Sequence, residues 1–416
     1  MAYLNSLLKH KVFMRLPPST QHLYPKKVAL LLKGLYGLKQ AGRLWNEDID
    51  ATLKKLGFKP CIAEPCVYVR HEANVITILV LYVDDILIAA PYDKPEVLST
   101  LKQELMSRYK MTDAGELSYI LGMRVQRPSP TSIFLDQVHY IRMNLVRYRL
   151  QDAHPVQTPM DLNVSLKNCQ PGEKQADKSL YQQAVGSLSF LAITTRPDIS
   201  TAVNICQRHL ANPSATHWTA VCRIWKYLKG TQDFSPYFDG TNKTPLHAFT
   251  DADYASDIND RKSTSGFCML FSGAAIHWKC SKRKCIVQSS TESEYVAGAL
   301  ATNKSVWFRN LLTQILGKPQ PPLPISMDSA SACHFAHNDT NSPRTKHIDV
   351  RYHVIREKIL DKEIILLPVA GVDNVADTCT KALPFPKFSE FRQLLGVIKF
   401  TSIPSVDPSL EVKRAY

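Results

Sequence analysis

Residues 75–89 read VITILVLYVDDILIA, and this stretch decides how the N-terminal part of the chain folds. Two apolar runs stand on either side of Asp84 and Asp85, which predicts a β-hairpin with both carboxylates at its tip. Ionised carboxylates side by side repel each other, and a divalent cation is the usual way to neutralise them. A solvated turn would also place two Asp residues together, so the dipeptide alone leaves both interpretations open.

Helical patterns surround the predicted hairpin. Apolar residues recur every three or four positions over residues 40–56, and Gly57 follows as a stop signal. Residues 94–110 repeat this pattern, and residues 180–230 show it again with breaks before two prolines. Between them, residues 155–180 are rich in Pro, Asn, Gln, Lys and Gly, which predicts an exposed connector.

Four acids in the C-terminal third form a second pattern. They lie, in order, in a strand-like run, at the start of a helical segment, after a short strand and before a second helical start: Asp251, Glu294, Asp328 and Asp377. Each acid on its own is typical of a surface. Asp253 competes with Asp251, and either Glu292 or Glu294 suits the third position of a capping box.

The composition is that of a folded, basic protein. Of the 416 residues, 44% are hydrophobic and 21% charged, which excludes collagen-like, coiled-coil and wholly disordered chains and suggests about three folding units. The 51 Lys and Arg against 37 Asp and Glu give a formal charge of +14. This excess favours nucleic acid as the partner, with a merely basic surface as the alternative.

The ten cysteines are scattered, and no pair lies near a second pair or a His at zinc-finger spacing. We therefore expect reduced thiols. The N-terminus does not show the pattern of a signal peptide, and the most apolar stretch is short and interrupted by two Asp residues. These features predict an intracellular protein, in a cytoplasmic particle or the nucleus.

Several motifs follow one another in a fixed order. Residues 35–45 (LYGLKQAGRLW) precede residues 82–85 (YVDD), and residues 119–123 (YILGM) and 195–199 (TRPDI) follow them. This series resembles the reverse transcriptase region of copia-type retrotransposon Pol polyproteins, in which YVDD is similar to the catalytic box. The resemblance covers about residues 2–390.

The resemblance implies an α+β multidomain fold, with a partial right-hand polymerase palm and a thumb/connection followed by a ribonuclease-H-like α/β domain. The implied domains are a truncated palm at 1–125, the thumb/connection at 126–244, the ribonuclease-H-like domain at 245–388 and a C-terminal tail at 389–416.

The resemblance also assigns catalytic roles. Asp84 and Asp85 would be metal ligands of the palm. In ribonuclease H the metal-binding acids follow the order strand, helix start, strand, helix start, and this implies two Mg²⁺ ions, replaceable by Mn²⁺, at the site formed by Asp251, Glu294, Asp328 and Asp377. By position, Asp251 is favoured over Asp253, and Glu292 remains the helix cap.

The implied partners are RNA–DNA hybrids and primer–template nucleic acid, dNTPs only where the palm is complemented, and other retrotransposon proteins. We assign nucleic-acid contacts to the polar and basic residues Lys39, Gln40, Arg43, Lys282, Arg283, Lys284, Lys346 and Arg351.

One departure from the family concerns the polymerase. Its third carboxylate lies a few residues before the segment similar to Ala2–Asn5, where this chain has Met1. With two ligands of three, metal affinity falls and nucleotide addition slows. We therefore expect a fragment with an impaired polymerase and an intact ribonuclease H site. The alternative is a non-catalytic relic or a domesticated nucleic-acid-binding protein.

Overall fold

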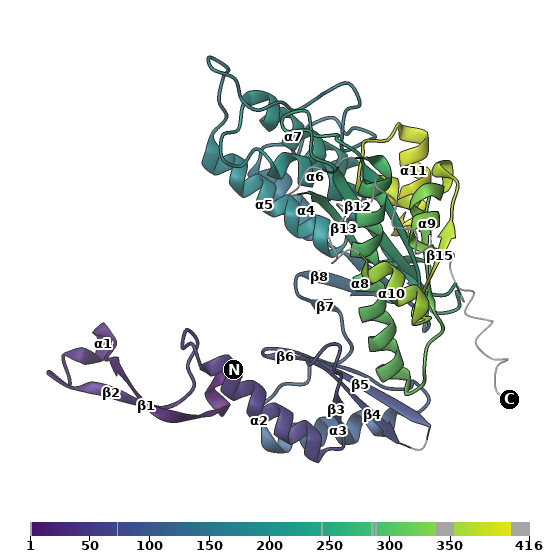
Figure 1. The fold of residues 1–416 in the computed structure, drawn as a ribbon. Coiled ribbons are helices and arrows are strands. Elements are labelled where there is room, and N and C mark those ends of the chain that lie inside the picture. Colours follow the sequence, from purple (N-terminus) through teal and green to yellow (C-terminus); the bar gives the residue numbers. More distant parts are fainter. Residues whose placement is uncertain are drawn as a thin grey trace. The chain divides into compact units, whose positions relative to one another are not determined.

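The computed structural model describes residues 2–72, 74–242, 244–283, 287, 289–337 and 353–400. The chain forms two compact units (Figure 1). Unit 1 comprises Met1–Leu117 and Trp307–Gln320, and unit 2 comprises Ser118–Val306 and Pro321–Tyr416. Within the described ranges, no helix has both the length and the apolar character needed to cross a membrane.

Unit 1 contains a four-stranded antiparallel sheet. Its strands, in spatial order, are β3 (Lys59–Pro60), β4 (Val67–Glu72), β5 (Val75–Tyr82) and β6 (Asp85–Ala89). Tyr82 pairs with Asp85 across the turn, which confirms the predicted hairpin. Asp84 lies in the turn, and Asp85 is the first residue of β6.

Both faces of this sheet are covered. Helices α2 (Ala41–Lys55) and α3 (Pro95–Arg108), which confirm the predicted periodicity, pack their apolar stripes on one face. The other face receives Leu311 and Ile315, from the C-terminal part of helix α8 (Ser290–Leu316). Burial on both faces explains why β5 is an almost unbroken apolar run.

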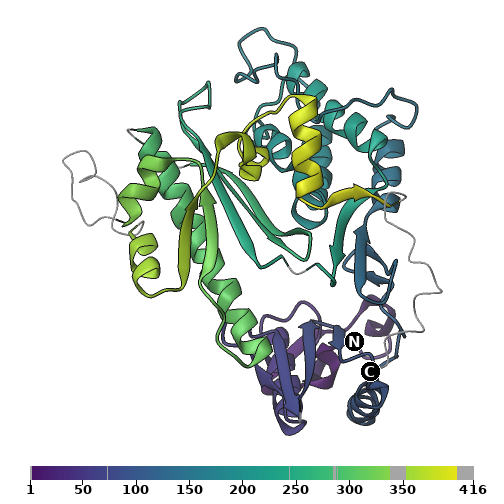
Figure 2. The same ribbon diagram turned by 90° about the vertical axis from the view of Figure 1, so that its right-hand side faces the viewer.

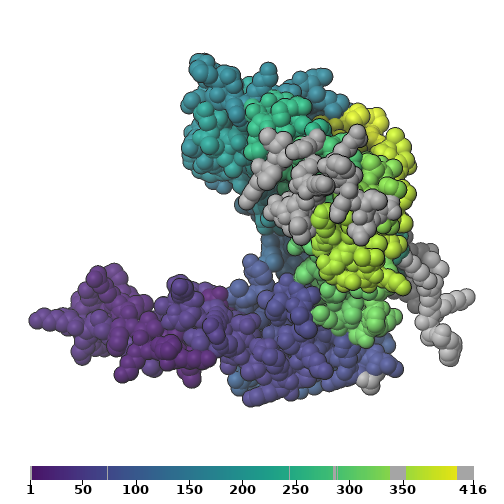
Figure 3. All heavy atoms as spheres, viewed as in Figure 1, coloured from purple at the N-terminus to yellow at the C-terminus, as the bar shows by residue number. Residues whose placement is uncertain are grey.

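The remainder of unit 1 begins with the short helix η1 (Tyr3–Asn5). Strands β1 (Leu7–Arg15) and β2 (Val28–Lys33) then form a two-stranded ribbon, with helix α1 (Pro18–Gln21) in their connection. Large apolar side chains of this ribbon, which is drawn in purple in Figure 3, are exposed. They include Leu7, Phe13, Val28, Leu30 and Leu32.

The first part of unit 2 joins a sheet to helices. The sheet has the order β16 (Val397–Lys399), β10 (Phe234–Asp239), β9 (Ser132–Asp136), β8 (Met123–Gln126) and β7 (Tyr119–Ile120). The helices are α4 (Val138–Arg147), α5 (Lys178–Thr194), η2 (Pro197–Ile199), α6 (Ser200–Gln207) and α7 (Ala215–Gly230). Both predicted breaks are confirmed, because Pro197 begins η2 and Pro213 precedes α7.

A buried ion pair anchors these helices. Arg196 Nη2 lies 2.7 Å from Asp198 Oδ2, and neither side chain is exposed. The Tyr227 hydroxyl from α7 donates a 2.5 Å hydrogen bond to the same carboxylate oxygen. Arg196 also donates to the backbone oxygen of Thr231. Arg196 and Asp198 of the TRPDI motif therefore hold η2 against the C-terminal end of α7.

The second part of unit 2 is a five-stranded mixed sheet (Figure 2). In spatial order its strands are β13 (Ala274–Lys282), β12 (Thr264–Phe271), β11 (His247–Asp253), β14 (Leu323–Met327) and β15 (Ile364–Pro368). Strand β12 is antiparallel to β11 and β13, whereas β14 runs parallel to β11 and β15. Around it lie α8, α9 (Ala330–His337) and α10 (Val354–Leu360).

The C-terminal elements complete unit 2. The short helices η4 (Gly371–Asp373) and η5 (Val375–Cys379) follow β15, and η5 packs against β11 and β12. Residues 389–400, the described part of the predicted tail, are folded: they include the C-terminal part of helix α11 (Phe385–Leu394) and β16, which pairs with β10. Phe391, Leu395 and Val397 are fully buried there.

Candidate metal centre

The sheet register brings Asp251 and Asp328 together. Strands β11 and β14 are parallel, and Thr250 pairs with Met327. Asp251 and Asp328 are the next residues along these two strands. The parallel register therefore places them side by side. Asp251 is 2% exposed, and the Thr380 hydroxyl donates a hydrogen bond to its Oδ2 atom.

Glu294 reaches these acids from the first turns of α8. Ser289 Oγ accepts a 3.1 Å hydrogen bond from the Glu292 backbone N–H, so Ser289 caps the helix. Gly298, four residues after Glu294, lets α8 approach the sheet: a Cβ atom there would lie 2.5 Å from Met327 Cε and 3.0 Å from Ile355 Cδ1. The helix thereby holds Glu294 against the end of β14.

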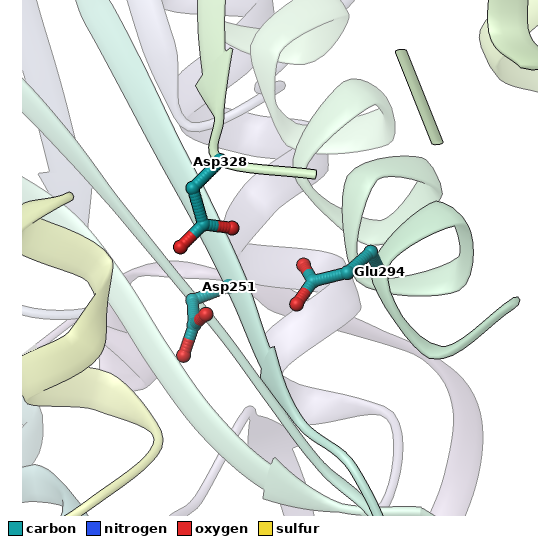
Figure 4. A group of neighbouring side chains, drawn as sticks. All are labelled: Asp251, Glu294 and Asp328. Carbon is teal, nitrogen blue, oxygen red and sulfur yellow. The ribbon is translucent and has the colours of Figure 1, made fainter. Parts of the chain in front are cut away.

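Asp251, Glu294 and Asp328 form one group. Each offers a carboxylate oxygen, and these three oxygens lie within 4.8 Å of one another. Figure 4 shows Glu294 pointing from its helix toward the two Asp side chains. Asp253, the rival candidate, is not in this group, and neither is Glu292.

The electrostatics of the group favour a cation. Burial, together with the charges of Asp251 and Asp328, raises the pKa of Glu294 to about 9. Burial and the charge of Asp251 also raise the pKa of Asp328. Glu294 is 9% exposed, and its Oε2 atom is buried without a hydrogen-bond partner. Carboxylate oxygens are hard ligands that suit Mg²⁺ or Mn²⁺, so the donor set fits such an ion.

Asp377, the fourth predicted ligand, lies beside this group in η5. Burial and the charge of Asp251 raise its pKa to about 6. Lys381 lies one helical turn further along the chain, and its Nζ atom is 2.9 Å from Asp377 Oδ1 and 3.6 Å from Asp251 Oδ2. The structure therefore gives the fourth acid a lysine partner.

Two features bring η5 close to the sheet. Gly266 of β12 pairs with Asp251 of β11, and a Cβ atom at Gly266 would lie 2.6 Å from the backbone oxygen of Cys379. The Asn374 side chain donates a 3.0 Å hydrogen bond to the backbone oxygen of Thr250 and accepts one from Ala376 N.

Three residues around the acids were not predicted from the sequence as functional: Asn374, Thr380 and Lys381. The i, i+4 spacing of Asp377 and Lys381 was a signal for that ion pair. The sequence held no comparable signal for Asn374 or Thr380, because their partners Thr250 and Asp251 lie more than a hundred positions away.

The Asp84–Asp85 pair lies at the exposed hairpin tip of unit 1. Val83 has a φ of 52°, an unusual conformation for a β-branched residue, and its carbonyl oxygen accepts a 2.8 Å hydrogen bond from Trp45 Nε1. The Tyr36 hydroxyl donates to Asp84 Oδ1. Although burial acts against it, this bond helps to lower the pKa of Asp84. Among the described residues, no group of three potential metal ligands includes Asp84 or Asp85.

The predicted nucleic-acid contacts differ in their surroundings. Lys39 and Arg43 are exposed at the start of α2, where Gln40 is the N-cap, and Arg43 Nε lies 2.8 Å from Glu47 Oε1. Lys282 Nζ lies 2.7 Å from Asp257 Oδ2 and 2.9 Å from Asp260 Oδ1. Arg283 is half-buried. The other three, Lys284, Lys346 and Arg351, lie outside the described residues.

Comparisons with known proteins agree with the motifs. Residues 1–162 match the family described as reverse transcriptase (RNA-dependent DNA polymerase). A Pol polyprotein from transposon TNT 1-94 of Nicotiana tabacum is 38% identical over 404 residues, which cover 95% of this chain and 30% of that protein. A Pol polyprotein from transposon RE1 of Arabidopsis thaliana is 35% identical, over 96% of this chain and 27% of its own length. This chain thus spans less than a third of these two relatives.

A shorter relative is matched almost throughout. The putative transposon Ty5-1 protein YCL074W of Saccharomyces cerevisiae is 34% identical over 301 residues, which cover 72% of this chain and 96% of that protein. Among solved structures, RNase H1 from Halobacterium salinarum matches 32% of this chain and 93% of its own length, with 17% sequence identity and a TM-score of 0.23. The sequence relatives show that the chain belongs to the family of copia-type retrotransposon Pol polyproteins, as a region that includes the reverse transcriptase.

Proposed function

We propose that unit 2 hydrolyses the RNA strand of RNA–DNA hybrids and that Asp251, Glu294 and Asp328 hold the divalent ion for this reaction. The observation that carries the proposal is the buried group of three carboxylates, in which Glu294 Oε2 has no hydrogen-bond partner. A buried, unpaired carboxylate oxygen is costly, and a bound cation would remove the cost. The family resemblance, which implies ribonuclease H chemistry, is the reason for proposing RNA hydrolysis as the reaction at this group.

The residues of the chain would have distinct roles in this reaction. The three acids bind and orient the ion, because each comes from a separate element whose position is fixed by register or helix packing. A bound Mg²⁺ would activate a water molecule and neutralise charge on the RNA phosphate. Attack of that water on phosphorus would break the P–O3′ bond and leave a 5′-phosphate and a 3′-hydroxyl. Contacts to 2′-hydroxyls would distinguish the RNA strand from the DNA strand.

The test is cleavage of an end-labelled RNA strand in an RNA–DNA hybrid with Mg²⁺. We expect Asp328→Asn and Glu294→Gln to lower cleavage by more than about 100-fold, because even partners of metal ligands contribute about 10–100-fold. Asp373→Asn is the matched control, since Asp373 is an exposed acid of η4 outside the group. Its cleavage rate should equal that of the unmodified chain.

Two outcomes would refute this proposal. Unchanged cleavage by both Asp328→Asn and Glu294→Gln would place the activity elsewhere. Folded protein that binds the hybrid but leaves the RNA intact would favour the alternative of a non-catalytic nucleic-acid-binding protein.

We also propose that the 416-residue chain by itself is a poor polymerase. Asp84 and Asp85 are exposed, and within the described ranges no third acid lies with them. Two carboxylates hold a pair of catalytic ions less firmly than three. In primer extension on an RNA template with dNTPs, we expect little or no product from a preparation that cleaves the hybrid. Efficient extension that Asp85→Asn abolishes would contradict this expectation.

A further inference from the structure

Lys381 is the one cation that the described residues place against the acids of the metal centre. Its Nζ atom lies 2.9 Å from Asp377 Oδ1 and 3.6 Å from Asp251 Oδ2. Asp251 is thus shared, because the same carboxylate also belongs to the group with Glu294 and Asp328. Asp377 is outside that group. The four acids therefore divide into a triad and a fourth acid, Asp377, and the Lys381 ammonium lies between Asp377 and the triad residue Asp251.

The segment that carries Lys381 is fixed to the sheet. The Thr380 hydroxyl donates to Asp251 Oδ2, and Gly266 leaves room for the backbone of Cys379. Asn374 ties the other end of η5 to the backbone of Thr250. The backbone of Lys381 is therefore held beside the acids by contacts that do not depend on its own side chain.

An ammonium and a divalent ion can each stabilise two neighbouring carboxylates electrostatically. Each neutralises their repulsion, but both together would place two cations against the same oxygens, where they repel each other. Only one of them is therefore expected between Asp251 and Asp377.

We propose that this centre binds one divalent ion, at Asp251, Glu294 and Asp328, and that the Lys381 ammonium takes the place of a second ion between Asp251 and Asp377. Asp377 is then a positioning residue for Lys381 rather than a metal ligand. This inference rests on the proposed function of the triad. It replaces the two-ion site implied by the family resemblance with one ion and one ammonium.

The experiment counts Mn²⁺ bound to the full chain by equilibrium dialysis and electron paramagnetic resonance, without substrate. We expect one Mn²⁺ per chain, with the spectrum of an isolated ion. Lys381→Met removes the charge but keeps the length of the side chain, so a second Mn²⁺ should bind and couple magnetically to the first. Lys381→Arg keeps the charge and is the matched control, with one isolated ion.

The outcomes separate this inference from the proposed function. No bound Mn²⁺ would refute the triad as a metal site. Two coupled ions in the unmodified chain would show that the lysine is displaced, and one ion in Lys381→Met would show that it excludes nothing. Either result overturns the proposal and leaves the triad standing.

Two further variants keep the test decisive if Lys381→Met does not fold. Asp377→Asn should retain one bound Mn²⁺ per chain, because its carboxylate holds Lys381 and not the ion. Asp328→Asn should lose that ion. If Asp377→Asn binds fewer Mn²⁺ ions than the unmodified chain, Asp377 is a ligand and the proposal fails.

Discussion

At the scale of single residues, His209 makes the stability of unit 2 depend on pH. Its ring stacks on that of His217 with 3.8 Å between centroids, and its side chain is 4% exposed. Burial, followed by the charge of His217, lowers the pKa of His209 from 6.5 to about 4. Arg208 and Lys282 act in the same direction, and Asp257 acts against them.

The lowered pKa of His209 means that the folded state becomes less stable as the pH falls. The folded state keeps His209 neutral between pH 6.5 and 4, whereas the unfolded chain takes up a proton in that window. The stabilisation is complete above pH 6.5 and is lost as the pH falls toward 4. Since one pKa unit corresponds to about 1.4 kcal/mol, we expect His209→Gln to remove about 1–3 kcal/mol of the pH dependence in urea unfolding. His154→Gln, at an exposed position, is the control. An unaltered pH profile in His209→Gln would contradict the assignment.

The sequence pointed to Asp251, Glu294 and Asp328, which form the candidate metal centre, but local patterns could not choose between neighbouring acids. Asp251 and Asp253 alternate in one strand, and the register with β14 decides which of them meets Asp328. Glu292 and Glu294 both follow a hydroxyl residue by three positions, and the approach of α8 to the sheet selects Glu294. These choices depend on pairings between distant segments, which local patterns do not contain.

At the scale of elements, local periodicity was enough to predict the hairpin, α2, α3 and the breaks between α5 and α7. The position of η5 was not predictable in this way. Its approach to β12 depends on the absence of a side chain at Gly266, more than a hundred positions before Cys379 in the sequence. The folded elements after residue 389 were missed for the same reason, because β16 gains its partner from distant β10.

Gly266→Ala tests this close approach. The added Cβ atom would lie 2.6 Å from a backbone oxygen and 2.7 Å from Cys379 Cβ, so η5 must move away from the sheet. We expect a loss of about 1–3 kcal/mol in stability, as for other overpacked sites, together with slower hybrid cleavage because Lys381 and Asp377 shift. Thermal unfolding and the cleavage assay measure the two effects.

A glycine in open space provides the control for that substitution. Gly186 lies within α5, and a Cβ atom added there would meet no described atom within 4 Å apart from the backbone of its own helix. Gly186→Ala should raise stability by up to about 1 kcal/mol through helix propensity, with unchanged cleavage. If Gly266→Ala behaved like Gly186→Ala, the close contact would not be what positions η5.

At the scale of the whole molecule, the order of motifs identified the family, whereas the compact units do not follow the order of the chain. Unit 1 takes Trp307–Gln320 from a region that the sequence assigns to the ribonuclease-H-like domain. Trp307 Nε1 donates a 2.7 Å hydrogen bond to the backbone oxygen of Ala63, and the Gln314 side chain accepts one of 2.6 Å from Ile62 N. The apolar periodicity of α8 indicated a buried face, but it could not show which sheet buries the last turns.

This discontinuity predicts that a substitution near the end of α8 destabilises unit 1. Leu311 packs on the face of the four-stranded sheet of unit 1 that carries Val67 and Val69, so Leu311→Asp would bury a charge there. We expect faster hydrogen exchange in β4 and β5, with exchange in β11 and β14 unchanged because those strands have a separate core. Asn310→Asp adds the same charge at an exposed neighbouring position and should leave both regions as they were. Equal loosening of both sheets by Leu311→Asp would mean that the two units unfold as one, since the altered side chain belongs to the core of unit 1 alone.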